Sequence, residues 1–222
     1  MALSPPRYIP IAILQKAPVT HSWDDWDPYP LVGTQREETM DRLARLSDRA
    51  IIAFAIGCAE WVVFRLGNLS TDPTPLDFLE AAWAFEMDKE IESLPESEDK
   101  DWQGPIRGPL DLSLMTILNT YYTTEEGTAE IEGAFAELVA LHVQHDTSYF
   151  EAWRKRALQR LSDHYPRKKS DTWGPPVPRE VLDPAVKISP ELAQEYVQRF
   201  LDGLDFEKNP FLKRVPGGDN SR

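Results

Sequence analysis

The feature that most constrains the fold is an apolar run from Ala50 to Phe64, set within a pattern of helical spacing. Upstream of it, apolar residues recur every three or four positions, as they do on one face of a helix. Inside the run they occupy all sides, so other elements must surround this helix. Glu60 interrupts the run, and it is shorter than a membrane span. We therefore predict a central helix with these residues nearly inaccessible to solvent: Ile51, Phe54, Trp61 and Val62.

The remaining chain carries the start and stop signals of further helices. Thr34 with Glu37 forms a capping box ahead of the central pattern, and Gly67-Asn68 ends it. Later helices are predicted to begin at Thr74, Gly108, Thr128, Ser148 and Ser189. The last one should turn inward Leu192, Tyr196, Phe200 and Leu204. The sequence thus predicts an all-α fold, a single orthogonal or bundle-like domain of about six helices.

Proline content divides the chain into four parts. Residues 1–33 contain six prolines, which exclude a long helix, and we expect this Pro-rich, aromatic-rich segment to pack on the core. Residues 34–165 form the helical core domain. Residues 166–212 combine a Pro-rich connection with a C-terminal helix packed on the core, and residues 213–222 are predicted to be a disordered tail.

Charge, cysteine content and the first residues argue against several classes of function and location. The net charge is −13 and the isoelectric point about 4.8, so nucleic-acid phosphates would be repelled. Cys58 is the single cysteine, which excludes an intramolecular disulfide and fits a reducing compartment. The first residues lack the charged and apolar regions of a signal peptide. We expect a cytoplasmic protein that binds neither nucleic acid nor membrane and uses no cofactor.

Charge is distributed unevenly along the chain. Residues 72–101 hold 11 acids against two lysines, whereas residues 151–169 hold seven Lys or Arg against two acids. Separated acidic and basic faces favour binding to a partner or to a second copy. The predicted partner-binding residues, expected to be exposed and clustered, are Glu80, Glu90, Glu92, Glu96, Glu98, Asp99, Asp101 and Trp102. Trp102 would be the aromatic anchor. Alternatively, these acids pair with the basic helix of the same chain through Arg154, Lys155 and Arg160.

His142 and His145 are the only closely spaced histidines. Their i, i+3 spacing allows both rings to reach one metal ion on a helix face, with Glu60 or Glu86 as a further ligand. The Glu-x-x-His and H-E-x-x-H signatures are absent, so we predict no bound metal. No motif of nucleophilic catalysis or phosphate binding occurs either.

Two further segments have unusual composition. Residues 21–30 are aromatic and acidic, and form either an ordered lead-in that covers the core or a recognition loop. Residues 102–111 contain two Gly-Pro steps around Arg107. They form either a rigid turn that places a tryptophan on the core or a cradle for an anion.

The leading functional hypothesis is a non-enzymatic acidic protein-binding module with a basic protein partner. One form of it is an immunity or inhibitor protein that neutralises a basic toxin or enzyme by covering its surface. The alternatives are a metal-dependent helical enzyme using His142 and His145, and a self-assembling structural protein whose acidic and basic faces pair as a homo-oligomer.

Overall fold

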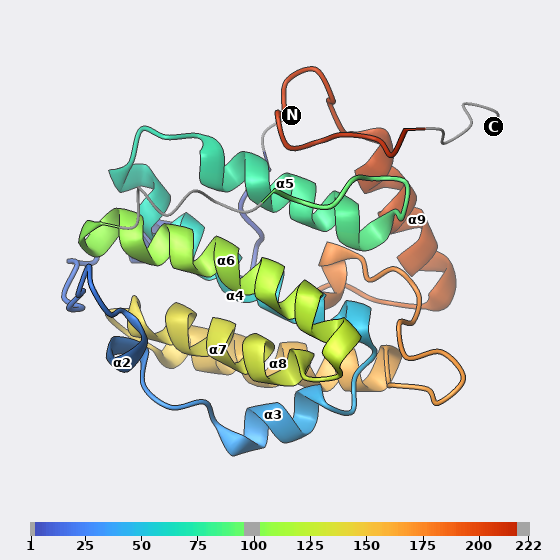
Figure 1. Cartoon of the computed structure of the whole chain (residues 1–222), viewed down its shortest axis with the longest axis horizontal. Coiled ribbons are helices and arrows are strands. Elements are labelled where there is room, and N and C mark those ends of the chain that lie inside the picture. Colours follow the sequence, from blue (N-terminus) through green and yellow to red (C-terminus); the bar gives the residue numbers. More distant parts are fainter. Residues whose placement is uncertain (1–2, 96–102, 217–222) are drawn as a thin grey trace.

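The computed structural model describes residues 3–95 and 103–216, which are mostly helical and contain no β-strand. The predicted all-α class is confirmed. These residues form nine α-helices rather than about six, because short helices occur in residues 11–43. The α-helices are α1 (Ile11–Leu14), α2 (Tyr29–Val32), α3 (Glu37–Leu43), α4 (Asp48–Leu66), α5 (Thr74–Met87), α6 (Gly104–Glu126), α7 (Ala129–His142), α8 (Ser148–His164) and α9 (Pro190–Asp202) (Figure 1). Two 3₁₀-helices are η1 (Gly67–Leu69) and η3 (Arg179–Leu182).

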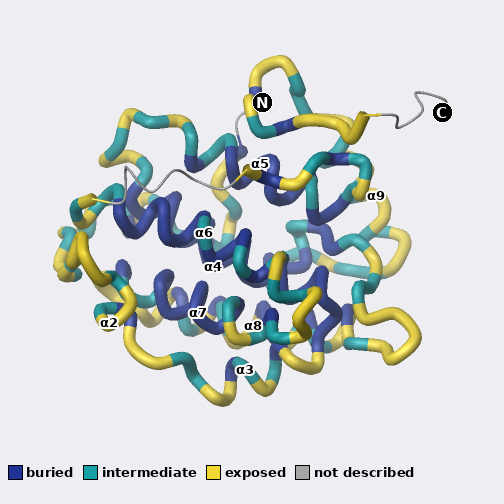
Figure 2. Tube along the Cα trace, in the orientation of Figure 1, coloured by how far each residue is buried: buried dark blue, intermediate teal, exposed yellow. Residues whose placement is uncertain are grey.

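Helix α4 is the centre of the molecule. All of its residues are buried, and it packs against α5, α6 and α7, so the predicted central helix is confirmed. Ile51, Phe54, Trp61 and Val62 are each 0% exposed. Figure 2 shows the buried chain concentrated in these central helices. Contrary to the length predicted from sequence, residues 48–69 are long and apolar enough to cross a membrane, but 94% of that window is buried inside the molecule, as in the core helix of a globular protein.

One buried carboxylate in α4 holds both the N-terminal segment and η3 on the core. Glu60 is 0% exposed and accepts hydrogen bonds from Trp83 Nε1 (2.8 Å), Tyr8 Oη (2.6 Å) and Arg179 Nε (2.5 Å). Each of its oxygens therefore has a partner, which offsets the cost of burying the charge. Tyr8 also stacks on Trp153 of α8, with ring centroids 5.4 Å apart. These contacts hold the N-terminal segment and η3 against α4.

The predicted first helix is divided in two. Thr34 does not cap it, because α3 begins at Glu37 after Arg36 with no side-chain cap. The chain then breaks, and the Ser47 side chain caps α4 by accepting from the Ala50 N–H. The backbone N–H groups of Ser47, Asp48 and Arg49 donate to carbonyls of Tyr165, Thr172 and Trp173. The start of α4 is thus fixed by residues more than 100 positions away in sequence, rather than by a local capping box.

Helix α6 begins four residues before the predicted start at Gly108. Its first residue is Gly104, Pro105 follows, and Pro109 lies inside the helix. Arg107 pairs with Asp72 and Asp111. Residues 104–111 are therefore helical rather than a turn, and two carboxylates of the same chain occupy the arginine of the expected anion cradle. Trp102, which the turn was expected to place on the core, lies outside the described residues.

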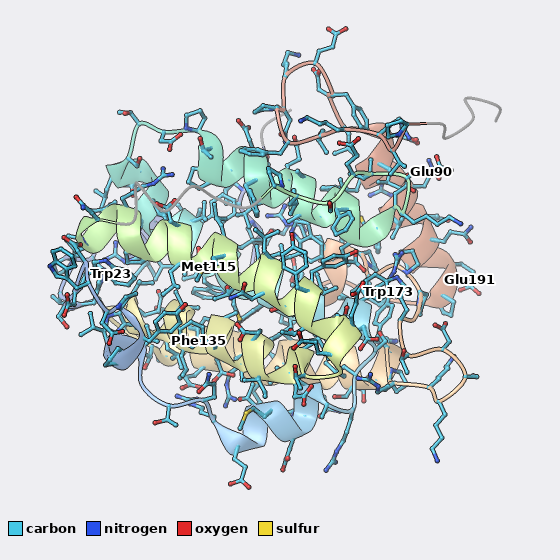
Figure 3. All side chains as sticks on the ribbon, viewed as in Figure 1. Trp23, Glu90, Met115, Phe135, Trp173 and Glu191 are labelled. Atoms are coloured by element: carbon cyan, nitrogen blue, oxygen red, sulfur yellow. The ribbon has the colours of Figure 1, made fainter. Side chains whose placement is uncertain are left out.

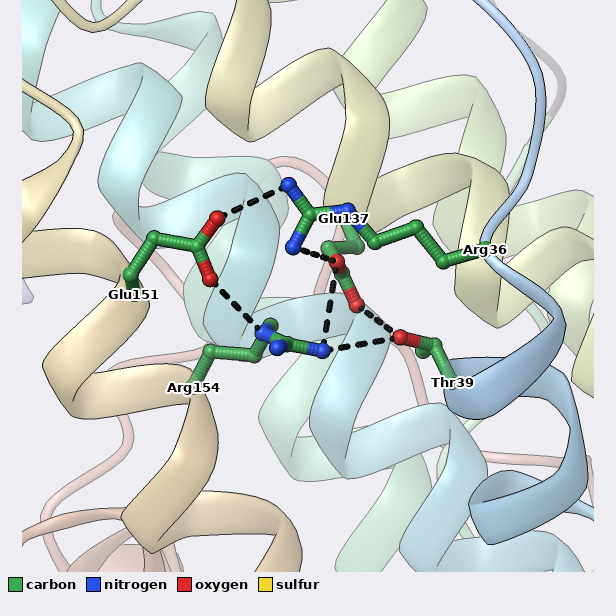
Figure 4. Close-up of polar contacts among 5 residues, drawn as sticks. All are labelled: Arg36, Thr39, Glu137, Glu151 and Arg154. Carbon is green, nitrogen blue, oxygen red and sulfur yellow. Dashed lines mark hydrogen bonds and ion pairs between the residues drawn. The ribbon is translucent and has the colours of Figure 1, made fainter.

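Arg154 of α8 takes part in an ion-pair network with α3 and α7 (Figure 4). Glu137 is 0% exposed and accepts a hydrogen bond of 2.7 Å from Thr39 Oγ1. Arg36 and Arg154 lie 3.4 and 3.5 Å from the other oxygen of Glu137, and both also bind Glu151. This network joins three helices and explains why a carboxylate is tolerated in the core.

The C-terminal region packs on the outside of the core. Ser189 caps α9 as predicted, by accepting from the Leu192 N–H (3.3 Å). No residue of α9 is buried, so the inward face predicted from the sequence is only partly covered. The chain then returns along α5, where Phe211 packs edge-on against Phe78. Lys213 to Pro216, predicted as tail, lie within this ordered return.

Candidate partner-binding surface

The predicted acidic surface is partly covered by the chain itself. Glu80 is only 7% exposed, and its Oε2 accepts a hydrogen bond of 3.0 Å from Asn209 Nδ2. The prediction that Glu80 is exposed is therefore wrong. Its position on α5 faces the returning C-terminal segment, which the local helical pattern could not reveal.

Glu90 and Glu92 follow α5 and are half-buried. Glu90 lies 3.8 Å from Arg214, and its carbonyl accepts from the Val215 N–H. The Glu92 N–H donates to the Lys213 carbonyl. Their backbone is thus paired with the C-terminal segment, although both side chains remain accessible in part. The other predicted partner-binding residues lie outside the described residues: Glu96, Glu98, Asp99, Asp101 and Trp102.

The basic helix does not neutralise the three acids of this surface that can be placed. Arg154 binds Glu137 and Glu151, and Arg160 donates to the carbonyls of Val181 and Val186. Lys155 and Arg156 are exposed.

A different surface has the most exposed large apolar side chain in the described part of the molecule. Trp26 is 96% exposed and lies in the segment of residues 20–28, which we call the Trp26 loop. The loop carries Asp24, Asp25 and Asp27 and no basic residue other than His21. Asp24 Oδ1 accepts from the Trp26 N–H (2.9 Å), which closes a local turn. The loop therefore presents one large aromatic ring among carboxylates.

The start of α6 holds this loop through groups that a helix leaves unpaired. The Gly104 N–H, one of the first donors of α6, donates to Asp25 Oδ1 at 2.6 Å. The Pro105 carbonyl has no helical donor, because Pro109 lacks an N–H, and it accepts from His21 Nε2 at 2.7 Å. Both bonds bind the loop to the first turn of α6, and the buried part of that helix begins directly after this turn, at Gly108.

Glycine makes room for the loop as well. Trp23 packs directly on Gly108, where an added Cβ would lie 2.1 Å from Trp23 Nε1. In Figure 3 Trp23 lies beside the first turns of α6. On the α7 side, His142 Nε2 donates to the Ser22 carbonyl (2.8 Å), and Tyr29 stacks on Phe135 with centroids 5.2 Å apart. The loop is therefore fixed on both sides of Trp26.

The histidines serve this anchoring. His142 uses Nε2 on the Ser22 carbonyl, and His145 Nδ1 lies 3.3 Å from Thr20 Oγ1. The His21 and His142 rings are 5.5 Å apart. Within residues 3–95 and 103–216, no three His, Cys, Asp or Glu side chains are placed to hold a metal ion. Neither Glu60 nor Glu86 supplies the third ligand that the metal-dependent alternative needs there. Glu60 binds Trp83, Tyr8 and Arg179, and Glu86 binds the Val177 N–H.

The electrostatics of the loop region are negative. Burial raises the pKa of the Tyr29 hydroxyl, and the carboxylates of Glu132 and Asp27 raise it further. Burial lowers the pKa of His21, and the His142 ring and Arg65 lower it too, against the Pro105 hydrogen bond. The loop histidine is therefore held neutral near pH 7, and the three aspartates are not offset by it.

Sequence reasoning named residues 21–30 as a possible recognition loop but did not include Trp26 among the binding residues. The Gly-Pro pattern of residues 104–109 was the sequence signal for the place where the Trp26 loop packs. Pro109 leaves the Pro105 carbonyl without a helical donor, and Gly108 leaves space for Trp23. Comparison with protein-family models, with curated proteins and with solved structures finds no match to this chain.

Proposed function

We propose that the protein is a non-enzymatic protein-binding module whose contact surface is centred on the Trp26 loop. The observation that carries this proposal is the 96% exposure of Trp26 in a loop held by hydrogen bonds and ring packing on both sides. Single exposed apolar side chains are common on protein surfaces, so the exposure is informative here because the loop that carries the ring is held in place. Tryptophan is also among the residues that most often dominate the affinity of an interface.

Anchoring matters for affinity as well as for position. A flexible loop loses conformational freedom when it binds, and this loss weakens the complex. Asp25, His21 and Trp23 already fix the loop in the free protein. Binding at Trp26 would therefore require little further ordering.

The charge of the loop indicates the partner. Asp24, Asp25 and Asp27 flank Trp26 in sequence, and the whole chain carries −13. The acidic stretch of residues 96–101 ends three positions before Gly104 in sequence, and the Gly104 N–H binds Asp25. A basic protein with an apolar recess suits this surface, because opposite charge speeds association. An inhibitor or immunity protein that covers a basic toxin or enzyme is one form of this function.

Self-assembly through acidic and basic faces is a weaker alternative. Two basic side chains of α8, Arg154 and Arg160, are used inside the chain. Only Lys155, Arg156 and their neighbours remain for a second copy. Sedimentation at low and high salt tests it, because electrostatic self-association weakens with added salt.

The proposal is tested by affinity capture from the native host on three immobilised proteins: wild type, Trp26→Ser and Tyr149→Ser. Tyr149 is a matched control, since it is exposed (42%) and aromatic but lies on α8. We expect a basic protein to be retained by wild type and by Tyr149→Ser, and lost from Trp26→Ser. Equal retention on all three matrices would place the interface elsewhere.

A further inference from the structure

A cavity of about 990 Å³ lies between α9 and the body of the protein. Its walls come from the end of α5, the end of α8, the connection after α8, and one face of α9. Helix α9, which forms one of its walls, lies at the opposite end of the molecule from the Trp26 loop (Figure 1). The size of this cavity matches cavities that hold small molecules, which run to about 1,000 Å³.

One wall of this cavity is apolar. Ala193, Val197 and Leu201 recur every four residues, so they form a single stripe along α9 that lines the cavity. Met87 and Ile188 also line it. Because no residue of α9 is buried, this stripe is only partly covered by the protein.

A buried cation lies on the opposite side. Arg49 lines the cavity although it is only 6% exposed. Its Nη1 donates to the carbonyls of Glu86 (2.5 Å) and Met87 (3.3 Å), and its guanidinium lies 5.5 Å from the centre of the Trp173 ring. Its Nε has no hydrogen-bond partner, and no carboxylate lies within ion-pair distance of it among the residues that the structure describes.

The nearest buried acid does not neutralise Arg49. Glu86 accepts a hydrogen bond from the Val177 N–H (3.0 Å) through one oxygen, and its other oxygen is unpartnered within the described chain. Burial raises the pKa of Glu86 to about 8. The group is therefore mostly protonated at pH 7, which leaves a positive charge beside the cavity.

The carboxylates at the rim of the cavity have other partners, which leaves basic side chains of its lining available to a ligand. Asp88 accepts from the Glu90 N–H (2.9 Å), Asp202 accepts from Gln198 (2.7 Å), and Glu90 pairs with Arg214. Lys89 and Lys168 also line the cavity, and neither forms an ion pair in the described residues.

We propose that this cavity binds a small amphipathic carboxylate, with its apolar chain along the α9 stripe and its carboxylate at Arg49. Arginine binds carboxylates through paired N–H donors, and a buried site strengthens such bonds. Nη1 of Arg49 is already bound to two carbonyls and Nε is buried, so the ligand would meet the part of the guanidinium that borders the cavity, with Lys89 and Lys168 beside it. The binding is independent of the function proposed for the Trp26 loop.

The test is a calorimetric titration of the whole protein with decanoate and with decan-1-ol, which share the chain but not the charge. We expect one decanoate per protein and a dissociation constant about tenfold or more below that of the alcohol, a difference of about 1.4 kcal/mol. Because Arg49 also binds two carbonyls of α5, its replacement would disturb the fold. Comparing decanoate with decan-1-ol tests the contribution of the Arg49 charge without replacing the residue.

Two variants locate the site. Ala193→Trp fills the cavity from the partly exposed α9 stripe and should weaken decanoate binding about tenfold or more. Glu195→Trp adds the same ring on the exposed side of α9 and should leave binding unchanged. Absence of decanoate binding, equal affinity for acid and alcohol, or full binding by Ala193→Trp would each overturn the proposal.

Discussion

The Trp26 loop and α9 are both attached to the outside of the same helical core, but they are attached in different ways. The loop is fitted closely, because Trp23 lies against Gly108 and Asp25 and His21 bind the end of α6. Helix α9 lies over a cavity of about 990 Å³ and buries none of its residues fully. The proposed binding of a macromolecule depends on the close fit of the loop, whereas the proposed small-molecule site depends on the loose fit of α9.

The loss of stability expected from a change in the core is the scale against which changes in both regions are compared. Trp61→Ala should lower the free energy of unfolding by about 3–5 kcal/mol, because it removes a fully buried ring and leaves a cavity. Urea unfolding monitored by circular dichroism measures it. A loss well under about 1 kcal/mol would show that α4 is not the central element.

The close fit of the loop predicts a loss at a glycine. Ala is normally favoured over Gly inside a helix by about 1 kcal/mol. At Gly108 the added Cβ meets the Trp23 ring, so we expect Gly108→Ala to destabilise by about 1–3 kcal/mol instead. Gly67→Ala is the control, since the nearest side-chain atom is 3.8 Å from its Cβ. If both variants unfold alike, the loop is not tightly packed on α6.

Acid should loosen the anchoring of the Trp26 loop. His21 donates through Nε2, so protonation must occur at Nδ1, which is buried with no acceptor among the described residues. Burial lowers the pKa of His21 below its ordinary 6.5. The unfolded state then binds more protons than the folded state as the pH falls through 6.5, so stability from this contact is present above that pH and lost below it.

Hydrogen exchange of residues 15–30 at about pH 7.5 and about pH 5.5, corrected for intrinsic rates, measures this loosening. We expect reduced protection at the lower pH in wild type and a smaller change in His21→Gln, whose amide donor does not titrate. Unchanged protection in wild type would argue against the His21 anchor.

The loose fit of α9 predicts the smallest effect. Val197→Ala should cost less than about 1 kcal/mol, because the side chain lines the cavity and is only partly buried. Thermal unfolding of Val197→Ala and Gly108→Ala, measured under the same conditions, compares the two losses of stability directly. A cost as large as that of Gly108→Ala would mean that α9 is packed as tightly as the loop.

The parts of the fold that could be predicted from sequence are those fixed by local pattern. The apolar run of α4 has no polar side to expose, so its central position followed, and Ser189 before Pro190 marked the start of α9. The break before α4 could not be predicted, since its first N–H groups bind carbonyls of Tyr165, Thr172 and Trp173.

The candidate site shows the same division. The acidic and aromatic composition around Trp26 is visible in the sequence, and so is the Gly-Pro pattern that begins α6. The contact that joins them is not visible, because the Pro105 carbonyl, which receives no N–H from Pro109, accepts from His21 only in the folded chain. Glu80 was misjudged for a similar reason, as its partner Asn209 lies 129 residues further on.

The central claim is that Trp26 supplies much of the binding energy for a basic protein partner. The most direct measurement is the dissociation constant of the captured partner for wild type and for Trp26→Ser, by titration calorimetry at fixed salt. The account predicts weakening of about 30-fold or more, equivalent to about 2 kcal/mol, with unfolding stability unchanged. An affinity within about twofold of wild type would contradict it.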